Sequence, residues 1–412
     1  MLDDSGFGPP ARRRGSGNVF THAIMAVLGA ALAAGLLLAF YGPASGGSLP
    51  GIGAVPAPGS SPAPLTGSRQ AIVTKVKPGV VIINTTLQYN REAAAGTGMV
   101  LNADGLVLTN NHVIENSTKI TATVPSAGRT YRARVVGYDK TGDIALLKLQ
   151  NASGLAPVPI GNSSPVRTGT TVVAMGNAEG RGAITAKPGH VTGLGQTITA
   201  SDNGGSTTSE TLHGMIQTNA HIVPGDSGGP LASAAGVIGM DTAGNNPGFQ
   251  QAPTGFAIPI NTALSVARQI AAGHASSTIT IGYPPFMGIF MGSGSTRSPQ
   301  AQAREQGQGA SSSGSAPACY TSNADLTVPP VIAPVRSGAL IDGTICGSPA
   351  ASAGMTGGAV ITAVNGQPVG SPVGLASILS RFHPGDTISV TWVSPSGHRT
   401  TSRLHLAAGP PQ

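Results

Sequence analysis

Short apolar runs separated by turn-forming residues recur through the middle of this chain. Val80–Leu87 is one such run and Ile144–Leu149 is another. Gly96–Leu101 and Gly105–Thr109 flank the sequence Asn-Ala-Asp-Gly at 102–105, which is a strong turn signal and predicts a β-hairpin. The pattern predicts a mostly β fold.

Helical patterns are fewer and shorter. Residues 68–77 read as a short helix leading into the first apolar strand, and Asn261–Ala272 reads as a second helix. Ser371–Phe382 has the spacing of an amphipathic helix. Residues 42–67 consist mainly of Gly, Pro, Ala and Ser with almost no bulky apolar pattern, so we expect a semi-extended linker there.

The N-terminal region carries the longest apolar stretch. Ala23–Tyr41 contains no charged residue and is long enough to cross a bilayer as a helix. Arg12, Arg13 and Arg14 precede it, so we expect residues 1–22 to be cytoplasmic and everything after the anchor to be outside the cell membrane. The alternative is a cleaved signal peptide with its small-residue site at Pro43–Ser45. Either interpretation predicts export.

The amino-acid composition narrows the fold class and the functions that are expected. Charged residues make up 9% of the 412 residues, whereas the chain has 60 Gly and 33 Pro, which is typical of loop-rich β domains. The net charge of +7 is not gathered into a basic stripe with interleaved aromatic residues, so we expect no nucleic-acid partner. A chain of this length has room for two or three domains.

The strongest chemical signal is the hexapeptide Gly225-Asp226-Ser227-Gly228-Gly229-Pro230. A serine hydroxyl is a poor nucleophile at neutral pH, so a neighbouring base must take its proton. The backbone freedom of Gly225 lets the N–H groups of Gly225 and Ser227 converge where the oxyanion of a tetrahedral intermediate would lie. The alternative is a Gly/Pro turn without chemistry.

His112 is the candidate base, because the second strand of the predicted hairpin would deliver it on a rigid support. Without the other motifs it would be interpreted as a structural histidine. Asp143 is the candidate carboxylate: it opens an apolar run, so it can be half-buried and fixed against an imidazole N–H. Asp139 is the second choice. Asp202 lies in a polar stretch, and Asp226 adjoins the serine, so its side chain should point away.

These motifs together resemble the HtrA/Deg family of trypsin-fold serine proteases, in particular its membrane-anchored and secreted actinobacterial members. The resemblance is carried by Thr109–Ile114, Gly142–Leu149, Gly225–Pro230 and Gly236–Ala243. It implies two six-stranded chymotrypsin/trypsin-like β-barrels over residues 68–273, with His112 and Asp143 on the first and Ser227 on the second. It also implies a homotrimer and no cofactor.

Several positions depart from the family pattern. His221 lies six residues before the serine, where the fold lines its primary specificity pocket, and Asp241 stands where Asn is common. The resemblance implies an S1 pocket formed by His221, Asp241 and Thr242. We expect it to accept a small or medium aliphatic P1 residue, and not Arg or Lys. A zinc site at His190, His213 and His221 lacks any HExxH-type spacing, so no metal is expected.

Residues 282–408 resemble an α+β PDZ domain. Phe286, Met287, Gly288 and Ile289 match its carboxylate-binding loop and first groove strand, where a peptide C-terminus would add a strand. Residues 292–337 are a low-complexity insertion that ordinary PDZ domains lack; it shields the groove or is a neutral loop. Cys319 and Cys346 can form a disulfide outside the cell, or both remain free.

The leading functional prediction is an exported, membrane-anchored serine endopeptidase that cleaves misfolded or damaged envelope proteins. Its PDZ domain would recruit or sense peptide C-termini. A proteolytically silent binding or chaperone module is the non-enzymatic alternative. A protease dedicated to one membrane-bound signalling protein would use the same chemistry on a different substrate.

Overall fold

The computed structural model describes residues 67–87, 89, 92–201, 209–242, 254–291, 317–326 and 329–411. The predicted cytoplasmic segment 1–22, the predicted anchor at 23–41 and residues 42–66 of the predicted linker lie outside them. So do Asp202, Ala243, and residues 292–316 and 327–328 of the predicted insertion. Among the described residues no helix is long and apolar enough to span a membrane.

The first part of the fold is a ring of six antiparallel strands. The ring runs in the order β5-β4-β1-β2-β3-β6 and closes because β5 also pairs with β6. On β4 the residues Ile120, Ala122 and Val124 are buried and alternate with more exposed neighbours, which is the period expected of a strand with one face in a core. The strands are β1 (Val80–Leu87), β2 (Glu92–Val100), β3 (Leu106–Thr109), β4 (Lys119–Val124), β5 (Arg129–Asp139) and β6 (Ile144–Leu149).

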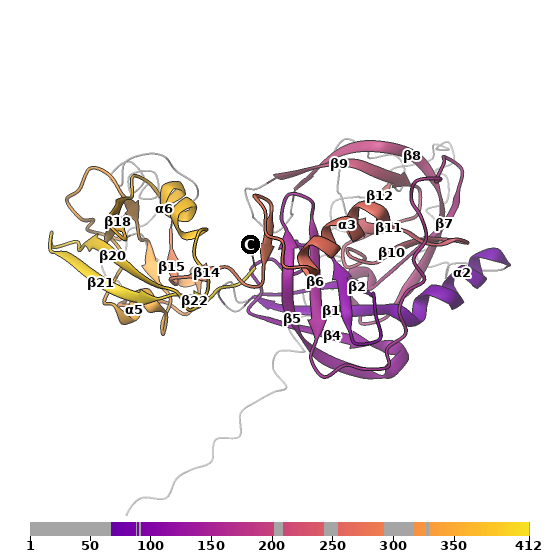
Figure 1. Ribbon diagram of the computed structural model, residues 1–412, viewed down its shortest axis with the longest axis horizontal. Coiled ribbons are helices and arrows are strands. Elements are labelled where there is room, and N and C mark those ends of the chain that lie inside the picture. The colour runs from indigo at the N-terminus through magenta and orange to yellow at the C-terminus, as the bar shows by residue number, and fades with distance from the viewer. Residues whose placement is uncertain are drawn as a thin grey trace, which may run out of the picture. The chain divides into compact units, whose positions relative to one another are not determined.

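The second part is a closed six-stranded barrel in the order β10-β11-β12-β9-β8-β7. Its longest strands, β8 and β9, form an extended hairpin that can be followed in Figure 1. The segment that contains Ser227 enters between β9 and β10. The strands are β7 (Thr171–Gly176), β8 (Thr185–Ser201), β9 (Ser209–Thr218), β10 (Pro230–Ser233), β11 (Gly236–Thr242) and β12 (Gly255–Pro259).

Both helices predicted around these strands are present. α2 (Ser68–Val76) leads through the 3-10 helix η1 (Lys77–Gly79) into β1. α3 (Ile260–Ala271) packs against β11 of the barrel and β5 and β6 of the ring, so it holds the two parts together (Figure 1). After α3, β13 (Ile279–Ile281) adds to the edge of β5. Two further 3-10 helices are η2 (Pro125–Ala127) and η3 (Ala178–Gly180).

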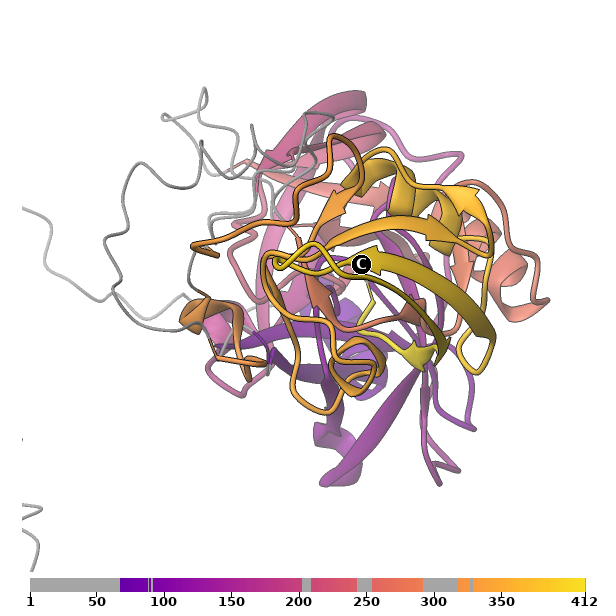
Figure 2. The same cartoon turned by 90° about the vertical axis from the view of Figure 1, so that its left-hand side faces the viewer.

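The C-terminal region is a small β structure with two short helices. Its main sheet runs β16-β18-β20-β21, with β19 also paired to β18, and smaller pairs join β14 to β22 and β15 to β17. Most of this region is coloured orange to yellow in Figure 2. The predicted helix at 371–382 is α6, which is capped by the Ser371 hydroxyl. Asn365 and Gly366, both with positive φ, form the predicted turn, between β18 and β19.

The elements of this region, in chain order, are β14 (Pro285–Phe286), β15 (Ile289–Phe290), η4 (Asn323–Asp325), β16 (Ala339–Leu340), β17 (Gly343–Thr344), α5 (Pro349–Ser352), β18 (Val360–Val364), β19 (Gln367–Pro368), α6 (Pro372–Leu379), β20 (Thr387–Val393), β21 (Arg399–His405) and β22 (Ala407–Ala408). The fold is therefore mostly β, as the sequence predicts: a ring, a closed barrel and a small C-terminal β region.

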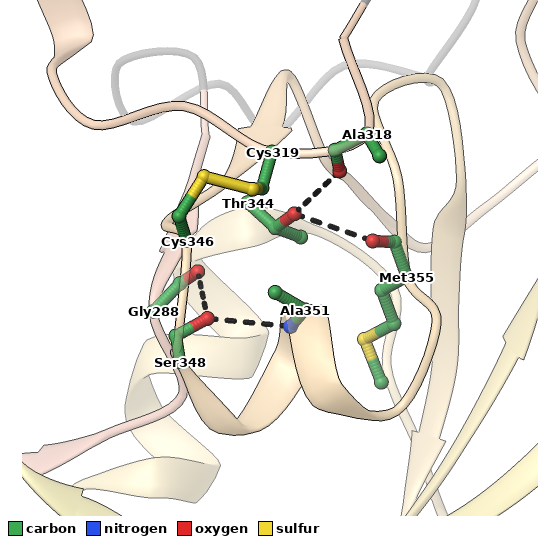
Figure 3. The surroundings of a disulfide bond; sticks show 8 residues. All are labelled: Gly288, Ala318, Cys319, Thr344, Cys346, Ser348, Ala351 and Met355. Carbon is green, nitrogen blue, oxygen red and sulfur yellow. Dashed lines mark hydrogen bonds between the residues drawn. A yellow bond between two sulfur atoms is a disulfide. The ribbon is translucent and has the colours of Figure 1, made fainter.

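Cys319 and Cys346 form a disulfide, which is one of the two alternatives that the sequence left open (Figure 3). Next to it, the Thr344 hydroxyl donates to the Ala318 carbonyl at 3.2 Å, and the N–H of Tyr320 donates to the Thr344 carbonyl at 2.7 Å. Residues 318–320 of the predicted insertion are thereby attached to β17 by hydrogen bonds and to Cys346, just after β17, by the disulfide.

Candidate active site

His112 lies just beyond the end of β3, as the hairpin pattern predicts. Two buried asparagines connect it to the strand, and the Nδ2 of Asn110 donates to the backbone carbonyl of Asp143 at 2.9 Å. This bond ties the segment that carries His112 to the turn that carries Asp143. The imidazole is 26% exposed, so one edge of the ring is open to solvent.

Asp143 presents its carboxylate to His112. The Nδ1 of His112 lies 2.9 Å from Oδ2 and 3.0 Å from Oδ1, and the backbone N–H of His112 donates to Oδ1 at 3.0 Å. A third donor, the Thr242 hydroxyl, reaches Oδ2 at 3.1 Å. Because an ionised carboxylate only accepts hydrogen bonds, this contact assigns the proton of the neutral imidazole to Nδ1 and leaves Nε2 as the basic nitrogen.

Ser227 is held by contacts from both parts of the fold. The N–H of Thr97 on β2 donates to the Ser227 carbonyl at 2.9 Å. On the other side, the N–H of Gly228 donates to the Asp241 carbonyl at 2.8 Å. Ser227 is only 4% exposed, so its backbone is locked where the ring and the barrel meet.

The peptide bond before Gly225 has a defined orientation. The Pro224 carbonyl accepts the N–H of Glu179 at 2.7 Å, and the Thr97 hydroxyl donates to the Gly225 carbonyl at 2.7 Å. In a trans peptide the N–H points opposite to the carbonyl, so the Gly225 N–H is directed away from Glu179. Within the described residues that N–H donates to no other group. The φ of +94° at Gly225 explains why glycine is required there.

A cavity of about 610 Å³ opens beside Gly225. Strands β1 and β2 form one wall, and the segments of Glu179 and Pro224 form another. Its lining includes the small side chains of Ala94 and Ala95. Within the described residues, no three His, Cys, Asp or Glu side chains cluster closely enough to hold a metal ion.

The residues predicted to form the S1 pocket have very different environments. His221 is exposed, whereas Asp241 and Thr242 are 0% and 2% exposed. Burial raises the pKa of Asp241 well above its ordinary value, and the nearby charge of Asp226 raises it further. Thr242 uses its hydroxyl on Asp143. The pocket itself stays a prediction.

The two other aspartates have structural partners. Asp226 forms an ion pair with Lys187 and accepts the N–H of Val223 at 2.9 Å, so its side chain is engaged away from the serine hydroxyl. Asp139 accepts the N–H of Gly142 at 3.1 Å within its own turn.

In the C-terminal region, the segment Phe286–Ile289 is tied to the segment that begins α5. The Met287 carbonyl accepts the N–H of Ala350 at 2.9 Å, and the Gly288 carbonyl accepts the N–H of Ile345 at 2.9 Å. By the same trans-peptide geometry, the N–H groups of Gly288 and Ile289 point the other way. Met287 is 2% exposed and packs in the core, while Phe286 and Ile289 are half-buried.

Sequence reasoning missed two contributors. Thr97 stands between two glycines in a strand, and no motif marks its hydroxyl, which also accepts the N–H of Asn177 at 2.9 Å. Lys187 is a lone lysine in a polar stretch, 39 residues from its partner Asp226. The sequence around each residue contains no motif that marks it, because each contacts the nucleophile segment only in the folded chain.

The chain is similar to known serine proteases. The family model for the trypsin-like peptidase domain matches residues 96–240. Serine protease PepD of Mycobacterium tuberculosis is 31% identical over 82% of this chain and 66% of its own length. The periplasmic pH-dependent serine endoprotease DegQ of Escherichia coli is 34% identical over 72% of this chain and 55% of its own. The chain thus spans between about half and two thirds of these relatives.

Among solved structures, the HtrA-type protease AlgW with a tripeptide is 27% identical to this chain. The match covers 84% of this chain and 99% of AlgW, with a TM-score of 0.43.

Proposed function

Because this chain belongs to the HtrA/Deg family of trypsin-like serine proteases, we propose that it is itself an endopeptidase that acts through an acyl-enzyme on Ser227. The observation that carries the proposal is the contact between His112 Nδ1 and the Asp143 carboxylate at 2.9 Å, made in the same fold that locks the Ser227 backbone.

In this mechanism His112 Nε2 takes the proton of the Ser227 hydroxyl as the oxygen attacks the scissile carbonyl. Asp143 stabilises the imidazolium that forms and does not itself become protonated. The N–H groups of Gly225 and Ser227 bind the developing oxyanion. His112 then protonates the leaving amine, and a water molecule activated by the same histidine releases the acyl group.

For the substrate, we propose unfolded or misfolded envelope proteins cut after small or medium aliphatic residues. The S1 assignment to His221, Asp241 and Thr242 is part of this proposal. The absence of an acidic group at position 221 supports it, because a basic P1 side chain would have no counter-charge there. A peptide-library profile dominated by Arg or Lys at P1 would contradict it.

We also propose export, with residues 23–41 as an uncleaved anchor, and assembly into a homotrimer. The charge asymmetry around the apolar stretch supports the orientation. The names of the relatives DegQ and DegP describe periplasmic proteases.

For the C-terminal region, we propose a PDZ domain over residues 282–408, following a protease domain over 68–273. Strand β15 pairs only with β17 among the described strands, so its other edge offers backbone groups to an added strand. The N–H groups of Gly288 and Ile289 would bind the terminal carboxylate of that peptide. A peptide ending in a free carboxylate should bind more tightly than its amidated counterpart.

The experiment that tests the enzymatic proposal compares cleavage of unfolded casein by the wild type and by Ser227→Ala. Loss of turnover in Ser227→Ala is expected. Ser265→Ala, which changes an exposed serine on α3, is the matched control and should cleave at the wild-type rate. Equal turnover by wild type and Ser227→Ala, or none by either, would favour a binding or chaperone module instead.

A further inference from the structure

Three ionisable side chains adjoin the nucleophile segment, and the proposed chemistry uses none of them. Lys187 comes from β8, Asp226 precedes Ser227, and Asp241 lies near the end of β11. Asp226 and Asp241 are 1% and 0% exposed, and the Lys187 side chain is 18% exposed. Charged groups are costly to bury unless a partner compensates them, so this cluster needs an explanation.

Asp226 closes the turn that contains Gly225. Its Oδ2 accepts the N–H of Val223 at 2.9 Å, and its own N–H donates to the Val223 carbonyl at 3.0 Å. The same Oδ2 forms the ion pair with the Lys187 ammonium. The carboxylate therefore holds both ends of the turn, and Lys187 holds the carboxylate.

Among the described residues, Lys187 forms its ion pair with Asp226 and not with Asp241. Neither of its carboxylate oxygens has a hydrogen-bond partner among the described residues, and the same is true of Asp226 Oδ1. Burial, and then the charge of Asp226, raise the pKa of Asp241, while Lys187 opposes the shift. The raised pKa makes Asp241 easier to protonate than an ordinary aspartate, and the ion pair places the Lys187 cation on Asp226.

We propose that Lys187 is a positioning residue for the oxyanion hole: through Asp226 it fixes the turn from Val223 to Ser227 so that the Gly225 N–H faces the reacting carbonyl. Without the ammonium, a buried carboxylate would have no counter-charge, and the turn would rearrange to bring Asp226 to water. The inference rests on the proposed function, since it describes how that catalytic site is held.

The test uses the full-length protein and a fluorogenic peptide amide. In Lys187→Met, kcat should fall about 10- to 100-fold while KM changes less than about threefold, because the oxyanion contact forms in the transition state. Affinity for a peptide boronate, which forms a tetrahedral adduct, should fall by a similar factor. Lys187→Arg keeps the cation and should recover kcat to within about threefold of the wild type.

Lys119→Met, at an exposed lysine on β4, is the matched control and should leave all three quantities unchanged. A folded Lys187→Met protein with kcat and boronate affinity within about threefold of the wild type would overturn the inference. So would a loss that Lys187→Arg does not recover. If circular dichroism shows Lys187→Met to be unfolded, Lys187→Gln replaces it, and equal kcat for the Gln and Arg variants overturns the inference. Absence of Ser227-dependent turnover in the wild type removes the proposed function and this inference with it.

Discussion

The Thr242 hydroxyl donates a hydrogen bond to Asp143 Oδ2 at 3.1 Å, and the two residues come from different halves of the fold. Thr242 ends β11 of the closed barrel, whereas Asp143 precedes β6 of the ring. The carboxylate that faces His112 is therefore oriented correctly only when the ring and the barrel are both folded and packed together. The orientation of the Asp143 carboxylate therefore depends on the packing of the ring against the barrel.

Thr242→Val removes this hydroxyl and keeps the shape of the side chain. We expect kcat for a peptide amide to fall about tenfold, because a hydrogen bond to a charged acceptor contributes roughly 1.5–3 kcal/mol and Asp143 keeps its other donors. Thr242→Ser restores the donor and should retain most of the activity. Wild-type kcat in Thr242→Val would show that the hydroxyl has no orienting role.

Asp143→Asn should lower kcat by about 10³- to 10⁴-fold, because an amide in place of the carboxylate no longer fixes the Nδ1–H tautomer or stabilises the imidazolium. Asp139→Asn is the matched control, since an amide oxygen can still accept the N–H of Gly142, and its kcat should stay close to the wild type. Steady-state kinetics on the two variants decide between the two aspartates. The opposite ranking would reassign the orienting role to Asp139.

Asp241 predicts a pH dependence of stability. Its pKa in the folded protein is raised above the ordinary value of 3.8, so the folded state binds the proton more tightly than the unfolded chain. The stabilisation from this proton is complete below about pH 4 and is lost as pH rises through the folded-state pKa, with a slope of at most about 1.4 kcal/mol per pH unit.

The difference in unfolding free energy between the wild type and Asp241→Asn isolates this effect. The amide does not titrate, and the contributions of all other titrating groups are the same in both proteins and cancel in the difference. In urea unfolding from pH 4 upward, the Asp241→Asn variant should gain stability relative to the wild type as pH increases. A difference between the two proteins that stays constant with pH would contradict the expectation.

The disulfide between Cys319 and Cys346 links positions 27 residues apart. Replacing both cysteines by serine should lower the free energy of unfolding of the C-terminal region by about 2–4 kcal/mol, since the unfolded chain regains the freedom that the link removes. Thermal unfolding with and without a reductant measures this loss. The double variant should be insensitive to the reductant, and a reductant effect that persists in it would point to another cause.

Much of the candidate site was predictable because each of its three central residues stands in a local pattern. Ser227 lies two residues after Gly225, a glycine that the tight turn requires, and His112 follows a hairpin signal. Asp143 stands directly before the buried strand Ile144–Leu149, and this position was the reason to prefer it to Asp139 as the candidate carboxylate. Such signals survive in the sequence because they reflect backbone geometry within a few residues.

Lys187 and Thr97 could not be found in this way. Each contacts the nucleophile segment across a long sequence separation, and each lies in a strand whose pattern reports only burial and pairing. The hydroxyl of Thr97, for example, donates to the carbonyl of Gly225, 128 residues away. In the sequence, a polar residue on a strand fits the same alternating pattern whether its side chain faces solvent or contacts a distant loop. The local sequence therefore does not distinguish these two environments.

The amino-acid sequence by itself determined the β architecture, the positions of the turns and the identity of the candidate nucleophile, base and carboxylate, because strand periodicity and turn chemistry are local. Only the tertiary structure decided which donors reach Asp143, how the Gly225 peptide is oriented and which cation balances Asp226. Those relationships depend on packing the ring against the barrel and on excluding water from their contact. Distance and burial of this kind are set by the whole fold and leave no pattern in a short stretch of sequence.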